Sequence, residues 1–216
     1  IREAYRNDDC TMMAMIFKTT MSSDETMEAI TQIRKLASKQ CFISGMSAVV
    51  TDTKDLCDKE VPIYVTIAVI LSLIVLSLTM DSFLVPIFFL LSIGMAIVYN
   101  LGTNVFKGEI SYITQALTAV LQLGVTMDYS IFLWHSYQEE KKVNGKENKE
   151  AMADAIASTF SSVIGSSITT VAGFVALCFM TFTLGLDLGI VMAKGVVIGV
   201  ICCVTVLPSM ILIFDK

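Results

Sequence analysis

The hydrophobic pattern changes abruptly near residue 60. Beyond that point, five long apolar stretches hold at most one charged residue each. A helix needs about 20 mainly apolar residues to cross a hydrocarbon core roughly 30 Å thick. The pattern therefore predicts five membrane-spanning helices, near residues 62–80, 83–101, 111–136, 159–180 and 187–213, with a loop at 137–158.

Residues 1–60 follow a different pattern. An apolar run of strand length covers residues 11–18, Ser22 and Glu25 have the spacing of a capping box that opens a helix, and a second strand-like run covers 41–50. This order predicts the end of an α/β porter domain whose remaining strands precede Ile1, because one helix on two strands buries too little surface to be stable. The predicted fold is a membrane all-α bundle (61–216) behind a partial α/β subdomain (1–60).

The composition agrees with a membrane protein. Hydrophobic residues make up 55% of the chain and charged residues 16%, and the mean hydropathy is +0.72. The charges sit mainly in residues 1–60 and 135–154, a distribution that leaves no basic surface for nucleic acid. No catalytic or metal-ligand constellation occurs in the sequence, so we predict no enzyme, metal or cofactor. Cys10, Cys41 and Cys57 permit one disulfide at most.

The placement of lysines predicts the orientation. Four lysines lie in the 137–158 loop and Lys216 follows the last span, whereas Lys107 is alone between the second and third spans. By the positive-inside rule the loop and the C-terminus are cytoplasmic and residues 1–60 are extracytoplasmic. Residues 152–160 fit two alternatives, a helix lying on the inner leaflet or a simple continuation of the fourth span.

Asp128 is the one charged residue of the third span. A carboxylate at such depth costs roughly 2.5–3.5 kcal/mol on insertion scales, and such groups usually face the bundle interior or a water-filled path. Burial without a partner raises a carboxyl pKa toward physiological pH, which suits a proton carrier. The alternative is a side chain that only ties helices together by a hydrogen bond. Tyr129 follows it, although adjacent helical residues point about 100° apart.

Four sequence stretches resemble one known family. Residues 121–140 (LQLGVTMDYSIFLWHSYQEE) resemble the fourth transmembrane helix of the MMPL family, within the resistance-nodulation-division (RND) superfamily. Residues 161–182 and 188–216 are similar to its fifth and sixth helices, and GMSAVVTD (45–52) is similar to the segment that leads from the porter domain into the second helix. The resemblance implies that the chain supplies helices two to six of one six-helix repeat, with the first repeat favoured by its FDK ending.

The resemblance also implies a function. In that family the Asp-Tyr pair serves proton translocation, a role that falls here on Asp128 and Tyr129, with a second pair expected in the other repeat. The predicted function is export of hydrophobic molecules, lipids or drugs, across the bacterial plasma membrane, driven by the proton-motive force. Its partners would be protons, membrane lipids and the missing second repeat of the same polypeptide. The alternative is a sterol-sensing-like or scaffold protein that binds lipid or partner proteins without pumping.

Further residues extend the candidate site. Gly124 shares a helix face with Asp128 and lets a helix or water approach it closely. Lys194, early in the last span, is assigned to the proton relay, where it could pair with Asp128; the alternative is a side chain that extends toward the outer interface. A hydroxyl stripe on the fourth span could supply water to Asp128, or its side chains could bond back to their own helix. Within that stripe we assign Ser166, Thr169 and Thr170 to helix packing near the proton relay.

Overall fold

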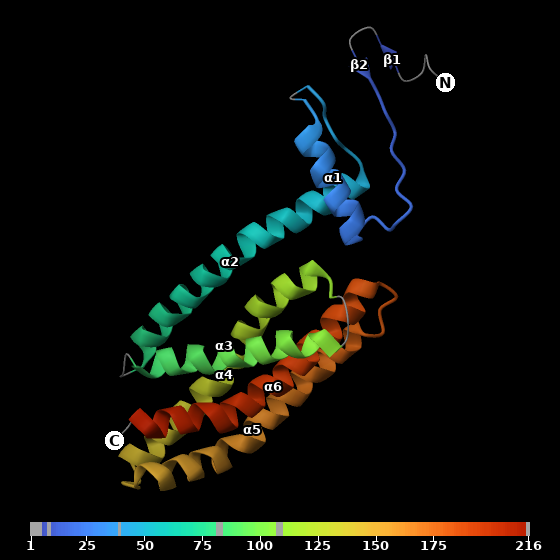
Figure 1. Cartoon of the computed structure of the whole chain (residues 1–216). Helices are drawn as coiled ribbons and strands as arrows, with labels where there is room; N and C mark the ends of the chain where they lie inside the picture. The colour runs from blue at the N-terminus through green and yellow to red at the C-terminus, as the bar shows by residue number, and fades with distance from the viewer. Residues whose placement is uncertain (1–5, 8–9, 39, 81–83, 107–109, 215–216) are drawn as a thin grey trace. The chain divides into compact units, whose positions relative to one another are not determined.

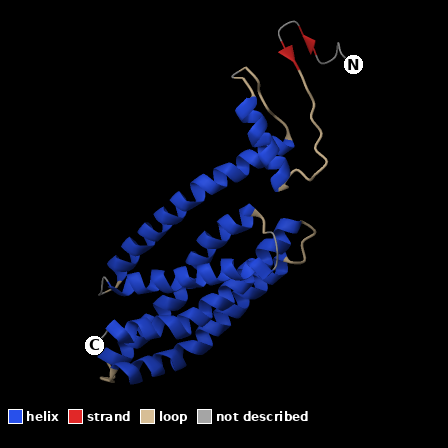
Figure 2. Ribbon diagram, in the orientation of Figure 1, coloured by secondary structure: helices blue, strands red, loops and turns tan. Residues whose placement is uncertain are grey.

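The computed structural model describes residues 6–7, 10–38, 40–80, 84–106 and 110–214, and helices dominate it (Figure 1). Figure 2 shows strands only near the N-terminus, where β1 (Arg6–Asn7) pairs antiparallel with β2 (Cys10–Thr11). The chain divides into two compact units, Ile1–Asp58 and Lys59–Lys216. The helices are α1 (Asp24–Leu36), α2 (Met46–Thr79), α3 (Leu84–Gly102), the 3-10 helix η2 (Thr103–Phe106), α4 (Tyr112–Lys142), α5 (Asn148–Leu177) and α6 (Thr183–Phe214).

Helices α2 to α6 correspond to the five predicted spans, and each is long and apolar enough to cross a membrane. The predicted five-helix bundle is confirmed at that level. The ends differ from the prediction because helices continue beyond the apolar stretches: α4 runs on to Lys142 and α5 already begins at Asn148. Most of the predicted 137–158 loop is therefore helical, and residues 152–160 continue the fourth span. Lys107 and Lys216, which support the predicted orientation, lie outside the described residues.

The predicted α/β subdomain is wrong for the part of the chain that the structure describes. The run at 11–18 pairs only at Thr11, and the run at 41–50 is a loop followed by the start of α2 at Met46. A strand needs a neighbour for its backbone groups, and a short apolar run does not by itself distinguish strand from helix. Gly45 turns the chain into α2 with a φ of 121°, a conformation that side-chain-bearing residues rarely adopt.

The helix between those runs forms as predicted, but its cap lies one residue later. Ser23, rather than Ser22, is the N-cap residue of α1, and its Oγ accepts a hydrogen bond from the Thr26 N–H at 3.3 Å. Arg34 forms a bidentate ion pair with Asp52, and the pKa of that carboxyl is held below its usual range by the guanidinium. This pair ties α1 to the first turns of α2.

The cysteines of the N-terminal unit form no disulfide among the described side chains. Cys41 and Cys57 are free thiols. The side chain of Cys10 lies outside the described residues, so the structure bears only on the pairing of the other two.

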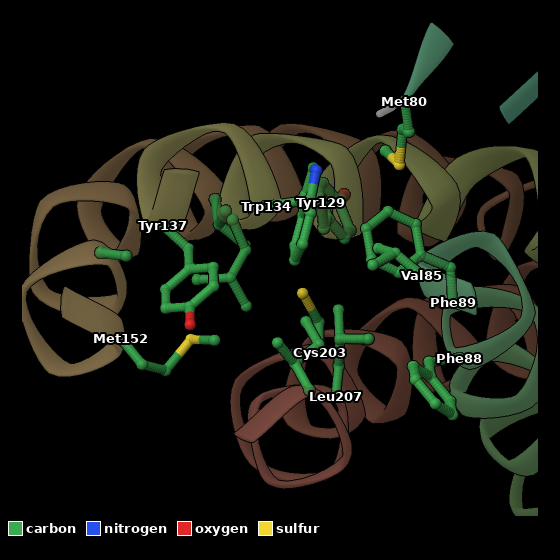
Figure 3. Close-up of a cluster of buried hydrophobic side chains, with 14 of the residues drawn as sticks. Met80, Val85, Phe88, Phe89, Tyr129, Trp134, Tyr137, Met152, Cys203 and Leu207 are labelled. Atoms are coloured by element: carbon green, nitrogen blue, oxygen red, sulfur yellow. The ribbon is translucent and has the colours of Figure 1, made fainter. Parts of the chain in front are cut away.

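Helices α3, α4, α5 and α6 pack into one bundle, and an apolar cluster at its centre fixes how α4 is turned (Figure 3). Tyr129, Trp134 and Tyr137 point from α4 into this cluster, toward Cys203 and Leu207 of α6. Tyr137 and Leu207 are both fully buried. Burial of large aromatic side chains stabilises such a contact strongly, so the rotation of α4 about its axis is well determined.

Candidate functional site

Helix α4 carries polar residues on two different faces. One set recurs every four residues and is buried, whereas the other face is exposed on the bundle and combines apolar residues with the single carboxylate of the span. The buried set is Thr114, Thr118, Gln122, Thr126 and Ser130. The exposed set is Leu117, Leu121, Gly124, Asp128 and Phe132.

Asp128 lies on the exposed face, one helical turn after Gly124. A Cβ added at Gly124 would meet no atom within 4 Å, so the space beside the carboxylate is open. Among the described residues, Asp128 makes no salt bridge and no side-chain hydrogen bond. The carboxylate is thus available to water or to another helix that packs on this face.

Tyr129 points the other way. Its side chain is 3% exposed and belongs to the apolar cluster (Figure 3). Adjacent residues of a helix diverge by about 100°, which accounts for the difference from Asp128. In this arrangement the tyrosine anchors α4 in the bundle, and the two members of the Asp-Tyr pair serve different faces.

The hydroxyl stripe of α5 lies beside the exposed face of α4. The hydroxyls of Ser136 and Ser158 are 2.8 Å apart, and the two helices run antiparallel. Asp128 lies eight residues before Ser136 on α4, and Ser166 lies eight residues after Ser158 on α5. In this antiparallel register Asp128 is therefore level with Ser166. The Thr169 and Thr170 hydroxyls donate to the Ser166 carbonyl at 2.7 and 3.0 Å, so their hydrogens are used within α5.

Lys194 lies elsewhere in the bundle. Its Nζ donates to Oδ1 of Asn104, at the end of α3 and the start of η2. Because Gly195 packs against Gln122, the lysine is level with the part of α4 about 9 Å from Asp128 toward the N-terminal end of that helix. No ion pair between Lys194 and Asp128 occurs among the described residues.

A buried amide network joins α3, α4 and α6. Asn100 Nδ2 donates to Gln122 Oε1 at 2.8 Å and to the Val191 carbonyl at 3.2 Å, and Gln122 Nε2 donates to the Gly195 carbonyl at 3.1 Å. Both amide side chains are fully buried. Three helices are therefore held in one register by hydrogen bonds between fully buried groups.

Two glycines of α6 make this network possible. A Cβ at Gly195 would lie 2.5 Å from Nδ2 of Asn100, and a Cβ at Gly199 would lie 2.3 Å from Cγ2 of Thr126. Only glycine lets α6 approach α4 this closely.

The sequence carried a signal for this contact that the prediction did not use. Gly195 and Gly199 have the small-xxx-small spacing of tight membrane helix pairs, and Gln122 lies on the partner helix. Asn100 had no comparable signal, because its position at the end of an apolar run is also typical of an interfacial residue. Within the described residues, no group of three or more His, Cys, Asp and Glu side chains is placed to hold a metal ion.

Comparison with known families confirms the resemblance that residues 121–140 carry. The model of the MMPL family matches residues 6–215. The chain belongs to the MMPL family. With its five apolar helices, this MMPL chain is a multi-pass membrane protein.

Several relatives of the MMPL chain are known by name. It is 25% identical over 225 residues to the membrane protein MJ1562 of Methanocaldococcus jannaschii, an alignment that covers all of this chain and 58% of the relative. It is 28% identical over 203 residues to the Probable transport protein MmpL4 of Mycobacterium leprae, with 88% of this chain and 21% of the relative covered. It is 24% identical to the Siderophore exporter MmpL5 of Mycobacterium tuberculosis, with 90% and 21% covered. The MMPL chain thus spans little more than half of the first relative and about a fifth of the other two.

Proposed function

We propose that this chain is the proton-coupling part of a transporter that exports a hydrophobic molecule across the plasma membrane, with Asp128 as the proton carrier. The names of two relatives, a transport protein and a siderophore exporter, support transport as the activity. Neither name indicates an enzymatic activity, so we propose none.

The observation that carries the proposal is the position of Asp128. It is the one carboxylate among the apolar residues of α4, and it lies on the exposed face of the bundle beside an open glycine. A carboxylate at membrane depth is costly unless it meets water or a partner group, and such residues usually mark proton or ion pathways. We expect a second repeat, in the same polypeptide, to cover this face.

Protonation would change how this face packs. Neutral Asp128 loses its charge and gains an O–H donor, so its burial against another helix costs much less than burial of the carboxylate. Protons that enter from outside and leave to the cytoplasm would thus alternate α4 between two packings. Each charge that falls through 100 mV releases about 2.3 kcal/mol, enough to shift such an equilibrium substantially.

The test is Asp128→Asn in the full-length protein, reconstituted in vesicles that contain a pH-sensitive dye. We expect proton flux to fall by a factor of about 100 or more, the range typical for loss of a proton-transfer group. Asparagine keeps the size of neutral Asp128 and can also donate a hydrogen bond, so the variant should stay folded, which thermal unfolding checks. Glu139→Gln, which removes a carboxylate outside the predicted span, is the matched control. Undiminished proton flux in Asp128→Asn would refute the proposal.

A cavity favours the second candidate function, a lipid-binding membrane protein that does not pump. The cavity has a volume of about 190 Å³, lies between α2, α3 and α4, and is lined only by apolar residues. Its lining is Val65, Ala68, Val69, Leu90, Gly94, Ile97, Ala119, Val120 and Leu123. An apolar cavity of this volume can hold a short segment of an acyl chain.

The two functions are separated by a Gly94→Leu variant. No atom lies within 4 Å of a Cβ at Gly94, so a leucine side chain fits there and fills the cavity. A lipid-binding protein would lose retention of a radiolabelled lipid in this variant and keep it in Asp128→Asn. A transporter without lipid binding at this cavity would lose proton flux in Asp128→Asn and keep it in Gly94→Leu.

A further inference from the structure

Three polar atoms at the contact of α3, α4 and α6 are buried without a protein partner. They are Oδ1 of Asn100, Nδ2 of Asn104 and Oγ1 of Thr114, and none has a hydrogen bond to another described residue. The three side chains are 0%, 2% and 0% exposed. We call the region formed by these residues and Gln122 the polar seam. A buried polar group without a partner costs free energy comparable to a lost hydrogen bond, so these three atoms require an explanation.

The orientation of the amides is set by their neighbours. Backbone carbonyls can only accept, so the Gly195 carbonyl requires Nε2 of Gln122, and the Val191 carbonyl requires Nδ2 of Asn100. A flip of either amide would bring two acceptors together. Oδ1 of Asn100 is therefore an acceptor without a donor.

The same reasoning applies to Asn104. An ammonium group can only donate, so the Asn104 atom that Lys194 contacts is Oδ1, and Nδ2 remains a donor without an acceptor. Both asparagines contact α6, so they lie on the same side of α3 and η2. They are four residues apart, and side chains at this spacing are neighbours with Cβ atoms about 5–6 Å apart, so their amide ends can approach to the roughly 4.5 Å that one bridging water spans.

We propose that a buried water molecule occupies the polar seam, where it accepts from Nδ2 of Asn104 and donates to Oδ1 of Asn100. Water fits both vacant roles. An anion would be repelled by the Asn100 oxygen, and a cation would be repelled by the Lys194 ammonium nearby. Lipid offers neither donor nor acceptor at this depth. The water completes a hydrogen-bonded line from Lys194 through Asn104 and Asn100 to Gln122, across three helices.

Two methionines of equal burial allow a direct test in the full-length wild-type protein. Met192 lies one turn before Gly195 on the same face of α6, beside the seam, and Met152 lies in the apolar cluster; they are 0% and 1% exposed. Radiolysis of bound water by X-rays oxidises the side chains next to it. We expect Met192 to be oxidised several-fold faster than Met152. Equal rates would overturn the proposal.

A variant assigns the effect to the seam. Asn100→Leu removes one of the two groups that hold the water, so oxidation of Met192 should fall to the rate of Met152. Unchanged oxidation in a folded Asn100→Leu protein would contradict the site. If that variant does not fold, Asn104→Leu decides: it removes the other group that holds the water, so oxidation of Met192 should fall in the same way, and unchanged oxidation would contradict the site. Thr118→Val, whose hydroxyl bonds to the Thr114 carbonyl at 2.6 Å, is the matched control.

The water site does not depend on the proposed transport. Asp128→Asn leaves the seam untouched, so Met192 should still be oxidised faster than Met152 in that variant. Loss of proton flux with unchanged Met192 oxidation supports both proposals, and each can fail without the other.

Discussion

The two faces of α4 use polar residues in opposite ways. On the buried face, Gln122 has protein partners for both its donor and its acceptor. Gly195 and Gly199 of α6 pack against this face. On the exposed face, Asp128 has an open glycine beside it and no partner within the described chain. The first arrangement holds one geometry, and the second leaves a titratable group free to change partners. Polar residues at membrane depth can therefore hold a bundle in one geometry or allow its packing to change. The residues around each polar group determine which of the two occurs.

The largest effect on the buried face should come from Gly199→Val. Its Cβ would lie 2.3 Å from Thr126, on the backbone-proximal part of a packed side chain, so α6 must move away from α4. Overpacking of this kind costs about 3 kcal/mol and would also separate the amide network. Thermal unfolding of the purified full-length protein measures the loss. A stability equal to the wild type would show that the α4–α6 contact is looser than described here.

Gln122→Leu should have the next largest effect. The variant removes the side-chain donor to the Gly195 carbonyl and leaves Asn100 with one acceptor fewer, at a cost of about 2 kcal/mol. Gln115→Leu, on an exposed position of the same helix, is the control and should change stability little. If the two variants are equally stable, the amide network contributes less than its burial indicates.

Gly124→Ala sharpens the comparison on the exposed face. Nothing lies within 4 Å of the added Cβ, so the described bundle predicts no loss, and alanine favours a helix by up to about 1 kcal/mol. A loss of stability in the full-length protein would show that another helix packs closely on this face. The same unfolding assay therefore reports whether the face of Asp128 is covered.

The smallest effect should come from replacing Lys146, in the turn between α4 and α5. Lys146 Nζ lies 2.7 Å from both Asp154 and Glu140, and these contacts raise the pKa of the ammonium. Lys146, followed by Asn144, lowers the pKa of the Glu140 carboxyl. Glu140 therefore adds stability above its ordinary pKa of about 4.5 and loses it as the pH falls through the lowered value, whereas Lys146 loses its contribution only above about 10.5.

Hydrogen exchange of the amides in the turn checks this pH dependence. Lys146→Met should exchange faster than the wild type at pH 7, and the difference should vanish well below pH 4.5. Lys149→Met, in the first turn of α5, should match the wild type at both pH values. A constant difference between Lys146→Met and the wild type across this range would exclude the ion pairs as its cause.

The sequence predicted the elements that depend on local composition. Long apolar stretches fixed the five spans, and the spacing of Gly124 and Asp128 placed both on one face. It failed for the α/β subdomain, because pairing of the 11–18 run depends on strands that local pattern does not supply. It also missed the amide network, because hydrogen bonds between Asn100 and α6 join residues about 90 positions apart and depend on how three helices pack.

The order in which the chain is made gives the amide network a further role. Asn100 and Gln122 enter the membrane in α3 and α4, but the carbonyls that they bind belong to α6, the last helix of the five. Until α6 is inserted, these amides have only each other to bind in an apolar surrounding that leaves polar groups unsatisfied. Arrival of α6 is thus the step that closes assembly of the bundle, and an incomplete chain that lacks α6 would expose two amides that quality-control proteases could recognise.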